Sequence, residues 1–271
     1  MTTLIGQRLR DFPEGLVMMT AVCCTVVLIE FSGFPAHRST FRAQHELSLK
    51  LSTVNQAYEK GNARYEDALA AYQIYAKAYQ RYLDAFQGSD ECRVGLAVLV
   101  LAFYPILANG RFSSVGMIAT PFGGWRYWCV AALVLTLVVA VLAIPAAGLW
   151  WLSGGRVDDI VSEEWHGGWW FHLRHFFLGP ASEEIIYRMG ICSIVAGWLG
   201  PRTAIAVSGV LFALVHLAYG GVNPVNLVAG FVLAWAFLKS NTILVPIALH
   251  GFGNILGWLI VTQLLIPLCQ R

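Results

Sequence analysis

The fold class of this chain is decided by a stretch without a single charged residue, residues 127–152, YWCVAALVLTLVVAVLAIPAAGLWWL. About 20 such residues are enough for a helix to cross the hydrocarbon core of a bilayer. Comparable apolar runs elsewhere predict an all-α, polytopic membrane protein with about seven transmembrane helices, near residues 15–34, 94–109, 127–152, 181–199, 203–219, 224–239 and 242–268. A shorter apolar segment, residues 169–179, is interrupted by His172, Arg174 and His175 and is predicted to be interfacial or re-entrant.

The amino-acid composition excludes an ordinary water-soluble domain. Of the 271 residues, 57% are hydrophobic and 13% are charged, whereas a typical soluble domain has about 25% charged residues. The net charge of +2 gives no electrostatic reason to expect nucleic acid or a polybasic grip on lipid headgroups. We therefore expect no nucleic-acid partner.

Residues 36–93 are strongly polar, with 8 Lys or Arg and 7 Asp or Glu. Apolar residues recur in this region at alternating spacings of four and three, which is the pattern of a helical seam. One straight helix from 40 to 86 would be about 70 Å long, so this region either lies along the membrane or folds back at Gly61 and Asn62. The similar lengths of the two halves favour an extramembrane antiparallel hairpin, on the cytoplasmic side. The seam should close Leu and Val against Tyr, and it comprises Leu47, Leu51, Val54, Tyr58, Gly61, Tyr65, Ala68, Tyr72, Tyr75, Tyr79, Tyr82 and Phe86.

The predicted hairpin has two possible roles. It is either a self-packed structural element, or a tyrosine-rich surface for a protein partner, a substrate or self-association through residues 40–86.

The first candidate for chemistry is the segment Gly179-Pro180-Ala181-Ser182-Glu183-Glu184-Ile185-Ile186-Tyr187-Arg188. Pro180 suits the first turn of a helix, which would place both glutamates near a helix N-terminus. Glu184 and Arg188 are spaced to pair along one helix face. Glu183 lies about 100° around the helix and is predicted to be free to act as a base or a ligand. The alternative is a capping pair at a loop-to-helix junction.

Two further helices carry candidate residues four positions apart on one face, Phe212 with His216 and His250 with Asn254. Either histidine alone is consistent with a simple interhelical hydrogen bond. Glycines beside His250 should let a neighbouring helix approach closely. Because burying these groups and the acid pair separately is unfavourable, we predict that they meet in one site.

Together these residue types can activate water. A carboxylate that takes a proton, a histidine that orients the same water and donors that face an oxyanion are the parts needed to hydrolyse an amide. Glu183, His216 and His250 are equally a ligand set for catalytic zinc. Spacing does not choose between the two mechanisms, and the H-E-x-x-H motif of other metalloproteases is absent from the sequence.

The three motifs together resemble the CPBP family, the CAAX protease and bacteriocin-processing enzymes also called Abi proteins. The resemblance covers about residues 170–265 and rests on Glu183-Glu184-x-x-x-Arg188, Phe212-x-x-x-His216 and His250-x-x-x-Asn254. It implies an all-helical intramembrane endopeptidase that cleaves a lipidated, tail-anchored or leader-bearing protein. One departure is Gly190, which follows the arginine by two residues where many members have glycine directly after it.

The resemblance also implies roles for the site residues. Glu183 would act with His216 on water, while His250 and Asn254 would stabilise the oxyanion. The ion pair of the first motif would brace the site, with Phe212 in support. Zinc and a metal-free glutamate mechanism are equally allowed.

The implied location is the plasma (inner) membrane of a prokaryote, as a multi-pass protein in contact with membrane lipid and a membrane-associated protein or peptide. The chain then divides into a tail with the first transmembrane helix (1–35), the tyrosine-rich hairpin (36–93), further transmembrane helices and loops (94–165) and a CPBP-like catalytic core (166–271).

Two other classes of protein remain as alternatives. A proton-coupled transporter would use Glu30, Glu183 and His216 as relay groups, although the sequence shows no internal repeat of the kind expected there. An inactive scaffold would bind a membrane partner through the hairpin. A rhomboid-type serine protease and a presenilin-like aspartyl protease are disfavoured, because the sequence lacks G-x-S-G and paired intramembrane aspartates.

Overall fold

The computed structural model describes residues 11–32, 34–152, 169–218 and 224–260, together with Ile5 and Leu9. Every regular element in these ranges is helical, and they contain no strand. The predicted all-α class is therefore confirmed.

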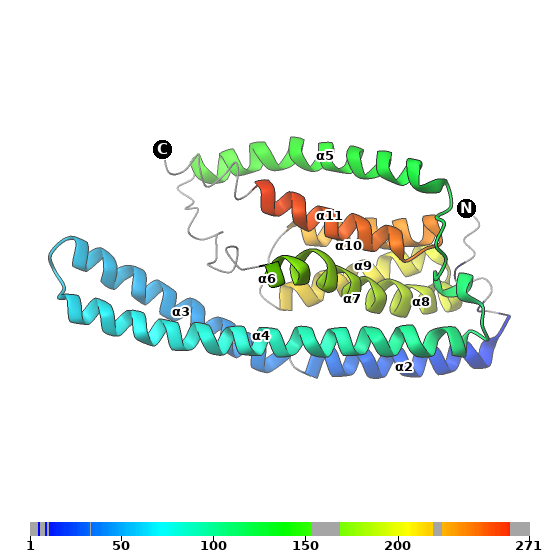
Figure 1. Ribbon diagram of the computed structural model, residues 1–271, viewed down its shortest axis with the longest axis horizontal. Helices are drawn as coiled ribbons and strands as arrows, with labels where there is room; N and C mark the ends of the chain where they lie inside the picture. Colours follow the sequence, from blue (N-terminus) through cyan, green and yellow to red (C-terminus); the bar gives the residue numbers. More distant parts are fainter. Residues whose placement is uncertain are drawn as a thin grey trace.

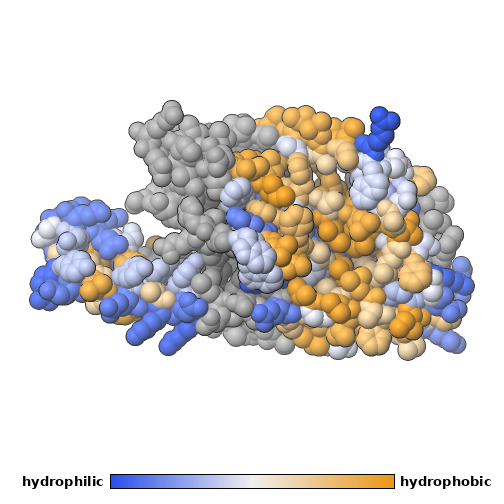
Figure 2. Space-filling view, in the orientation of Figure 1, coloured by the Kyte–Doolittle hydropathy of each residue, from blue (hydrophilic) through white to orange (hydrophobic). Residues whose placement is uncertain are grey.

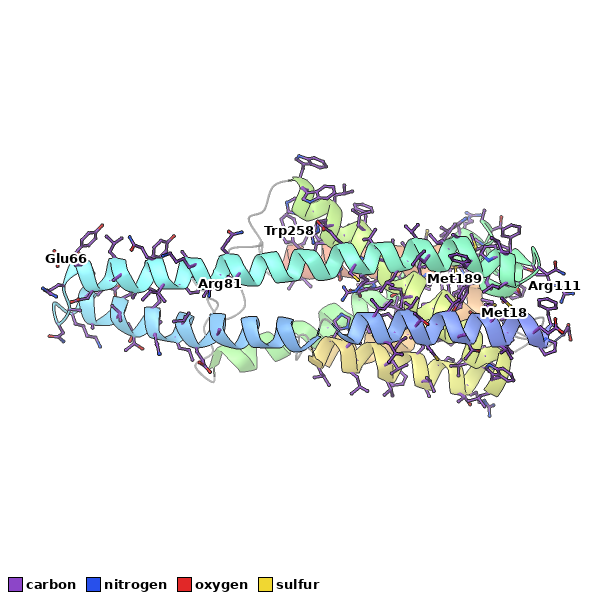
Figure 3. All side chains as sticks on the ribbon, turned by 90° about the horizontal axis from the view of Figure 1, so that it is seen from below. Met18, Glu66, Arg81, Arg111, Met189 and Trp258 are labelled. Carbon is purple, nitrogen blue, oxygen red and sulfur yellow. The ribbon has the colours of Figure 1, made fainter. Side chains whose placement is uncertain are left out.

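The helices lie roughly side by side in layers (Figure 1). Helix α2 (Pro13–Ser32) runs antiparallel to the second half of α4 (Tyr65–Leu107), and Figure 3 shows the two side by side. A hydrogen bond from the Tyr104 hydroxyl on α4 to the carbonyl of Met19 on α2, at 3.2 Å, connects the two helices. The next layer contains α9 (Pro201–Ala218), α10 (Pro224–Ser240) and α11 (Leu244–Leu259). Helix α5 (Gly124–Leu152) covers the far side, next to α11 and after the short η1 (Phe112–Val115).

The hairpin is formed by α3 (Phe34–Glu59) and the first half of α4, and it projects beyond the other helices (Figure 1). The chain reverses where Gly61 adopts a left-handed φ of 74° and the Asn62 amide donates to the carbonyl of Ala57. Arg64 and Asp67 cap the start of α4, and the hydrogen bonds from Arg64 hold the pKa of Asp67 below its usual value. The predicted antiparallel helical hairpin and its turn at Gly61 and Asn62 are confirmed, while its extramembrane position on the cytoplasmic side stays a prediction.

The composition of the seam differs from the prediction. Tyr58, Tyr65 and Tyr72 are 45%, 62% and 53% exposed. The reason is that alanines line the packed face of α4, where small side chains let α3 approach closely. The half-buried residues of the interface include Leu51, Val54, Ala68, Ala71, Tyr75, Ala78 and Tyr79, while the side chains of Tyr82 and Phe86 lie outside those described. The prediction that Leu and Val of one helix pack against Tyr of the other is therefore wrong for Tyr58, Tyr65 and Tyr72.

Helix α4 has no break at the end of the hairpin. It continues through residue 93, where the polar region was predicted to end, and stops at Leu107. Figure 2 shows hydrophilic side chains gathered on the projecting end of the hairpin and apolar side chains over the helical body. One unbroken helix therefore joins the polar hairpin to the apolar body.

Each predicted span falls wholly or partly on a helix. Among the residues described, however, no helix reaches the combined length and apolar character that crossing a membrane requires. The seven transmembrane helices are accordingly not confirmed.

A helical segment from Trp169 to Leu199 carries the first motif, and two of its stretches are π-helical. Because the Gly179 amide donates to the carbonyl of Arg174, five residues back, the helix is widened just before Pro180. The successive parts are α6 (Trp169–Leu173), η4 (Arg174–Leu178), α7 (Gly179–Glu184), η5 (Ile185–Cys192) and α8 (Ser193–Leu199). Pro180 stands in the first turn of α7, as predicted, but α7 continues η4 without a break, so no free helix N-terminus lies beside the two glutamates.

Candidate active site

Glu184 and Arg188 form a fully buried ion pair. The Nε of Arg188 donates to Oε2 of Glu184 at 2.8 Å, and neither side chain has any exposed surface. The Nη1 of Arg188 donates to the hydroxyl of Ser208 at 2.7 Å, and this hydroxyl donates to the carbonyl of Tyr187. The guanidinium also lies 4.8 Å from the centre of the Phe212 ring. The pairing predicted from the spacing is present, and the hydrogen bond from Arg188 to Ser208 links η5 to α9.

His250 brings α11 into the same network. Its Nδ1 lies 2.9 Å from Oε1 of Glu184, so the carboxylate binds an arginine with one oxygen and a histidine with the other. The next residue, Gly251, lets the helices approach closely, because a Cβ there would lie 2.4 Å from the carbonyl oxygen of Phe176. The close approach predicted for the glycines is thus real at Gly251, whereas a Cβ on Gly253 would meet no atom within 4 Å.

Glu183 points away from this ion pair, as its position about 100° around the helix predicts. Its Oε1 accepts a hydrogen bond from Nη1 of Arg93 at 3.0 Å, and the two side chains are 14% and 11% exposed. Its Oε2 lies 3.9 Å from Nε2 of His216 and 3.9 Å from Nε2 of His250. One carboxylate oxygen is therefore held by a cation, and the other faces both histidines.

The partners of the two histidines define which ring nitrogens carry protons. Nδ1 of His216 lies 2.9 Å from the carbonyl oxygen of Phe212, which can only accept, so Nδ1 is the donor. Nδ1 of His250 likewise donates to Glu184. In the neutral form of each ring, Nε2 is then a lone pair that faces Oε2 of Glu183. A separation of 3.9 Å is too long for a direct hydrogen bond but suits a bridging water.

The last predicted site residues have packing roles as well. Asn254 uses its amide nitrogen to donate to the carbonyl of His175 at 2.9 Å, so one of its two N–H groups is engaged with η4. The Phe212 ring lies 4.3 Å from the His216 ring, centre to centre, and 5.8 Å from the His250 ring. Burial lowers the pKa of His175, against the opposing effect of the Glu183 charge.

The structure thus brings Glu183, Glu184, Arg188, His216 and His250 together, and the Phe212 ring contacts both histidine rings. Two participants were missed by the sequence-based prediction. Ser208 gives no signal that separates it from other serines on apolar helices. For Arg93 the sequence does contain a signal. The motifs hold two acids, Glu183 and Glu184, but a single arginine, so burying both acids requires a second cation from elsewhere in the chain.

The predicted zinc ligands Glu183, His216 and His250 do not form a metal-holding group in this structure. Within the ranges given above, no three His, Cys, Asp or Glu side chains are close enough together to hold a metal ion. The Glu183 carboxylate also already binds a cation, the guanidinium of Arg93. We therefore derive no step through a metal, and metal dependence stays a prediction.

The segment that carries the three motifs matches a known protease family. Residues 165–256 match the family described as type II CAAX prenyl endopeptidase Rce1-like. The resemblance stated from the three motifs is confirmed over this segment, as a similarity to CAAX prenyl endopeptidases.

A curated relative is similar over a shorter stretch. The UPF0177 protein YxdF of Lactococcus lactis subsp. lactis (strain IL1403) is 30% identical over 78 residues. The aligned stretch is 29% of this chain and 42% of that protein, so the chain spans less than half the length of the relative it matches. No solved structure matches.

Proposed function

We propose that this protein is an intramembrane endopeptidase that hydrolyses a peptide bond by means of water activated by Glu183 and His216. The observation that carries the proposal is the convergence on one carboxylate oxygen, with Oε2 of Glu183 lying 3.9 Å from Nε2 of each histidine. A water among these three atoms can donate its protons to the carboxylate and to His216. Its lone pairs are then free to attack a carbonyl carbon, and Glu183 takes the proton that the water loses.

His250 has a different role. The proposed water has two protons, and it donates them to Oε2 of Glu183 and Nε2 of His216. It has no proton left for Nε2 of His250, so this nitrogen must carry a proton of its own. His250 lies between two carboxylates, Oε1 of Glu184 at 2.9 Å and Oε2 of Glu183 at 3.9 Å, which favour an imidazolium. We assign His250 this form, with Nε2–H as the donor to the developing oxyanion.

The remaining motif residues support these groups. The second N–H of the Asn254 amide is the other proposed oxyanion donor, while its first holds η4. Glu184 and Arg188 keep His250 oriented. The Phe212 ring packs against both histidine rings, and its backbone carbonyl fixes the tautomer of His216. This assignment requires no metal, and zinc held by Glu183, His216 and His250 is the alternative to be measured.

The proposed substrate is a membrane-associated protein that is lipidated, tail-anchored or leader-bearing. The match of residues 165–256 to CAAX prenyl endopeptidases supports this class and a membrane location. We retain as proposals the seven-span arrangement in a prokaryotic plasma membrane and the four-part division of the chain. The hairpin, with three exposed tyrosines at positions 58, 65 and 72, is the proposed surface for a partner or for self-association.

The test is peptide cleavage by the purified full chain in lipid, with an isoprenylated CAAX peptide as the first probe. We expect E183Q and H216A each to lower kcat by at least about 100-fold, as expected for loss of a general base, with Tm close to wild type for H216A. The matched control is E66Q, an exposed glutamate near the hairpin tip, which should cleave normally. Retained cleavage by E183Q would refute the base role.

Two further measurements separate the alternatives. Stoichiometric zinc that is lost together with activity on chelation would support the metal mechanism instead. Transport of a solute across vesicles without hydrolysis would support a transporter. Because the substrate is open, terminal-peptide mass spectrometry of membranes that contain wild type or E183Q identifies the cleaved proteins directly.

A further inference from the structure

Arg93 lies outside the segment that matches the protease family, yet it contacts the central residue of the site. It belongs to α4, and 90 positions separate it from Glu183 in the chain. Its Nη1 donates to Oε1 of Glu183 at 3.0 Å, and only 11% of the Arg93 side chain is exposed. The contact is therefore a mostly buried ion pair between the two parts of the chain.

The charges of the site explain why such a cation is needed. Glu183 and Glu184 are adjacent, and Arg188 is bound to Glu184 with both side chains fully buried. A second buried carboxylate beside the first is unfavourable unless it has its own positive partner. Arg93 supplies that partner and makes the Glu183 ion pair geometrically separate from the Glu184 ion pair.

We propose that Arg93 is a positioning residue for Glu183. By binding Oε1, it fixes the rotation of the carboxylate so that Oε2 faces His216 and His250. The inference rests on the proposed function of Glu183 as the base that activates water. It adds that the site is completed by a residue from the N-terminal part of the chain, so that the family-matched segment alone lacks one component.

The placement of Arg93 makes it well suited to this role. The same helix runs from the hairpin tip through residue 93 to Leu107, where it packs against α2, α7 and η5. A residue in the interior of a packed helix is held more precisely than one on a loop. Arg93 also lies roughly 42 Å along the helix from Tyr65 at 1.5 Å per residue, so one uninterrupted helix joins the hairpin tip to the residue that binds Glu183.

The first experiment compares R93Q and R93K with wild type in the cleavage assay. We expect R93Q to lower kcat by about tenfold or more and to change KM by less than about twofold, because Arg93 is proposed to act through Glu183 and not on the substrate. R93K, which keeps the charge, should recover part of the lost kcat. The matched control is R81Q, an exposed arginine on the same helix (Figure 3), which should behave as wild type. An unchanged or increased kcat in R93Q would overturn the proposal.

The second experiment does not depend on activity. It is a double-mutant cycle in which the Tm of R93Q, E183Q and the double variant is compared with that of wild type. If the two residues are coupled, the Tm loss of the double variant should be much smaller than the sum of the two single losses. Strictly additive losses would overturn the proposal even if R93Q were inactive, since inactivity would then reflect general damage. If instead the cycle shows coupling but E183Q still cleaves, the ion pair stands and the proposed base role of Glu183 fails.

Discussion

Replacement of Glu184 by glutamine is the sharpest test of the buried network. The substitution keeps the size of the side chain but removes the charge that balances Arg188. It also weakens two charge-assisted hydrogen bonds, from Nε of Arg188 at 2.8 Å and from Nδ1 of His250 at 2.9 Å. The Arg188 guanidinium would remain fully buried, with the Ser208 hydroxyl and the Phe212 ring as its nearest neutral partners.

The magnitude follows from the burial of both partners. Removal of one member of a buried ion pair destabilises a protein by about 3–5 kcal/mol. For chains of about 150–250 residues, each kcal/mol lowers Tm by about 2–4 °C, so the expected loss is roughly 6–20 °C. The matched control is D67N, which removes a carboxylate from the Arg64–Asp67 pair, where the side chains are 78% and 51% exposed. Exposed pairs contribute little, so D67N should leave Tm unchanged.

The assay is thermal unfolding of wild type, E184Q and D67N under identical lipid conditions. A Tm loss in E184Q no larger than that in D67N would refute the reasoning, because it would mean that the buried network does not stabilise the fold. Cleavage should fall in E184Q as well, since His250 loses the partner that orients it.

Two further predictions concern packing around the network. S208A should lower the free energy of unfolding by about 1–3 kcal/mol, because Nη1 of buried Arg188 loses its acceptor; chemical denaturation of the variant checks this, and an unchanged midpoint would contradict it. G251A should reduce both Tm and cleavage, since its Cβ would lie 2.4 Å from the carbonyl oxygen of Phe176, while G253A has open space and should retain both. Equal behaviour of the two glycine variants would show that close approach at Gly251 is unimportant.

The sequence-based prediction succeeds wherever helix periodicity alone decides the geometry. Glu183 and Glu184 point to different partners because adjacent helical residues are about 100° apart. Arg188 meets Glu184, and His216 lies against Phe212, because residues four apart share a face. The reversal at Gly61 is expected because one straight helix over residues 40–86, about 70 Å long, would leave too few residues to bring the chain back to the next apolar segment.

The prediction fails where a contact from elsewhere in the fold overrides the local signal. Pro180 is typical of a helix start, but the widened turn at Arg174 and Gly179 lets the helix continue through it. The exposure of Tyr65 and Tyr72 has a similar cause, since alanines on the neighbouring face give a closer helix contact than a tyrosine seam would allow.

Glu183, His216 and His250 are oriented in the same way, and the motifs reveal this only in part. Each of the three side chains is held by one partner, through the atom that does not face the other two. Glu184 holds Nδ1 of His250, and the carbonyl of Phe212 holds Nδ1 of His216, so two of the three constraints lie within the motifs. The third, Arg93 on Oε1 of Glu183, lies in another part of the chain. Because a carboxylate rotates freely without such a partner, a protein with the same motifs but without α4 would need another donor to orient its base.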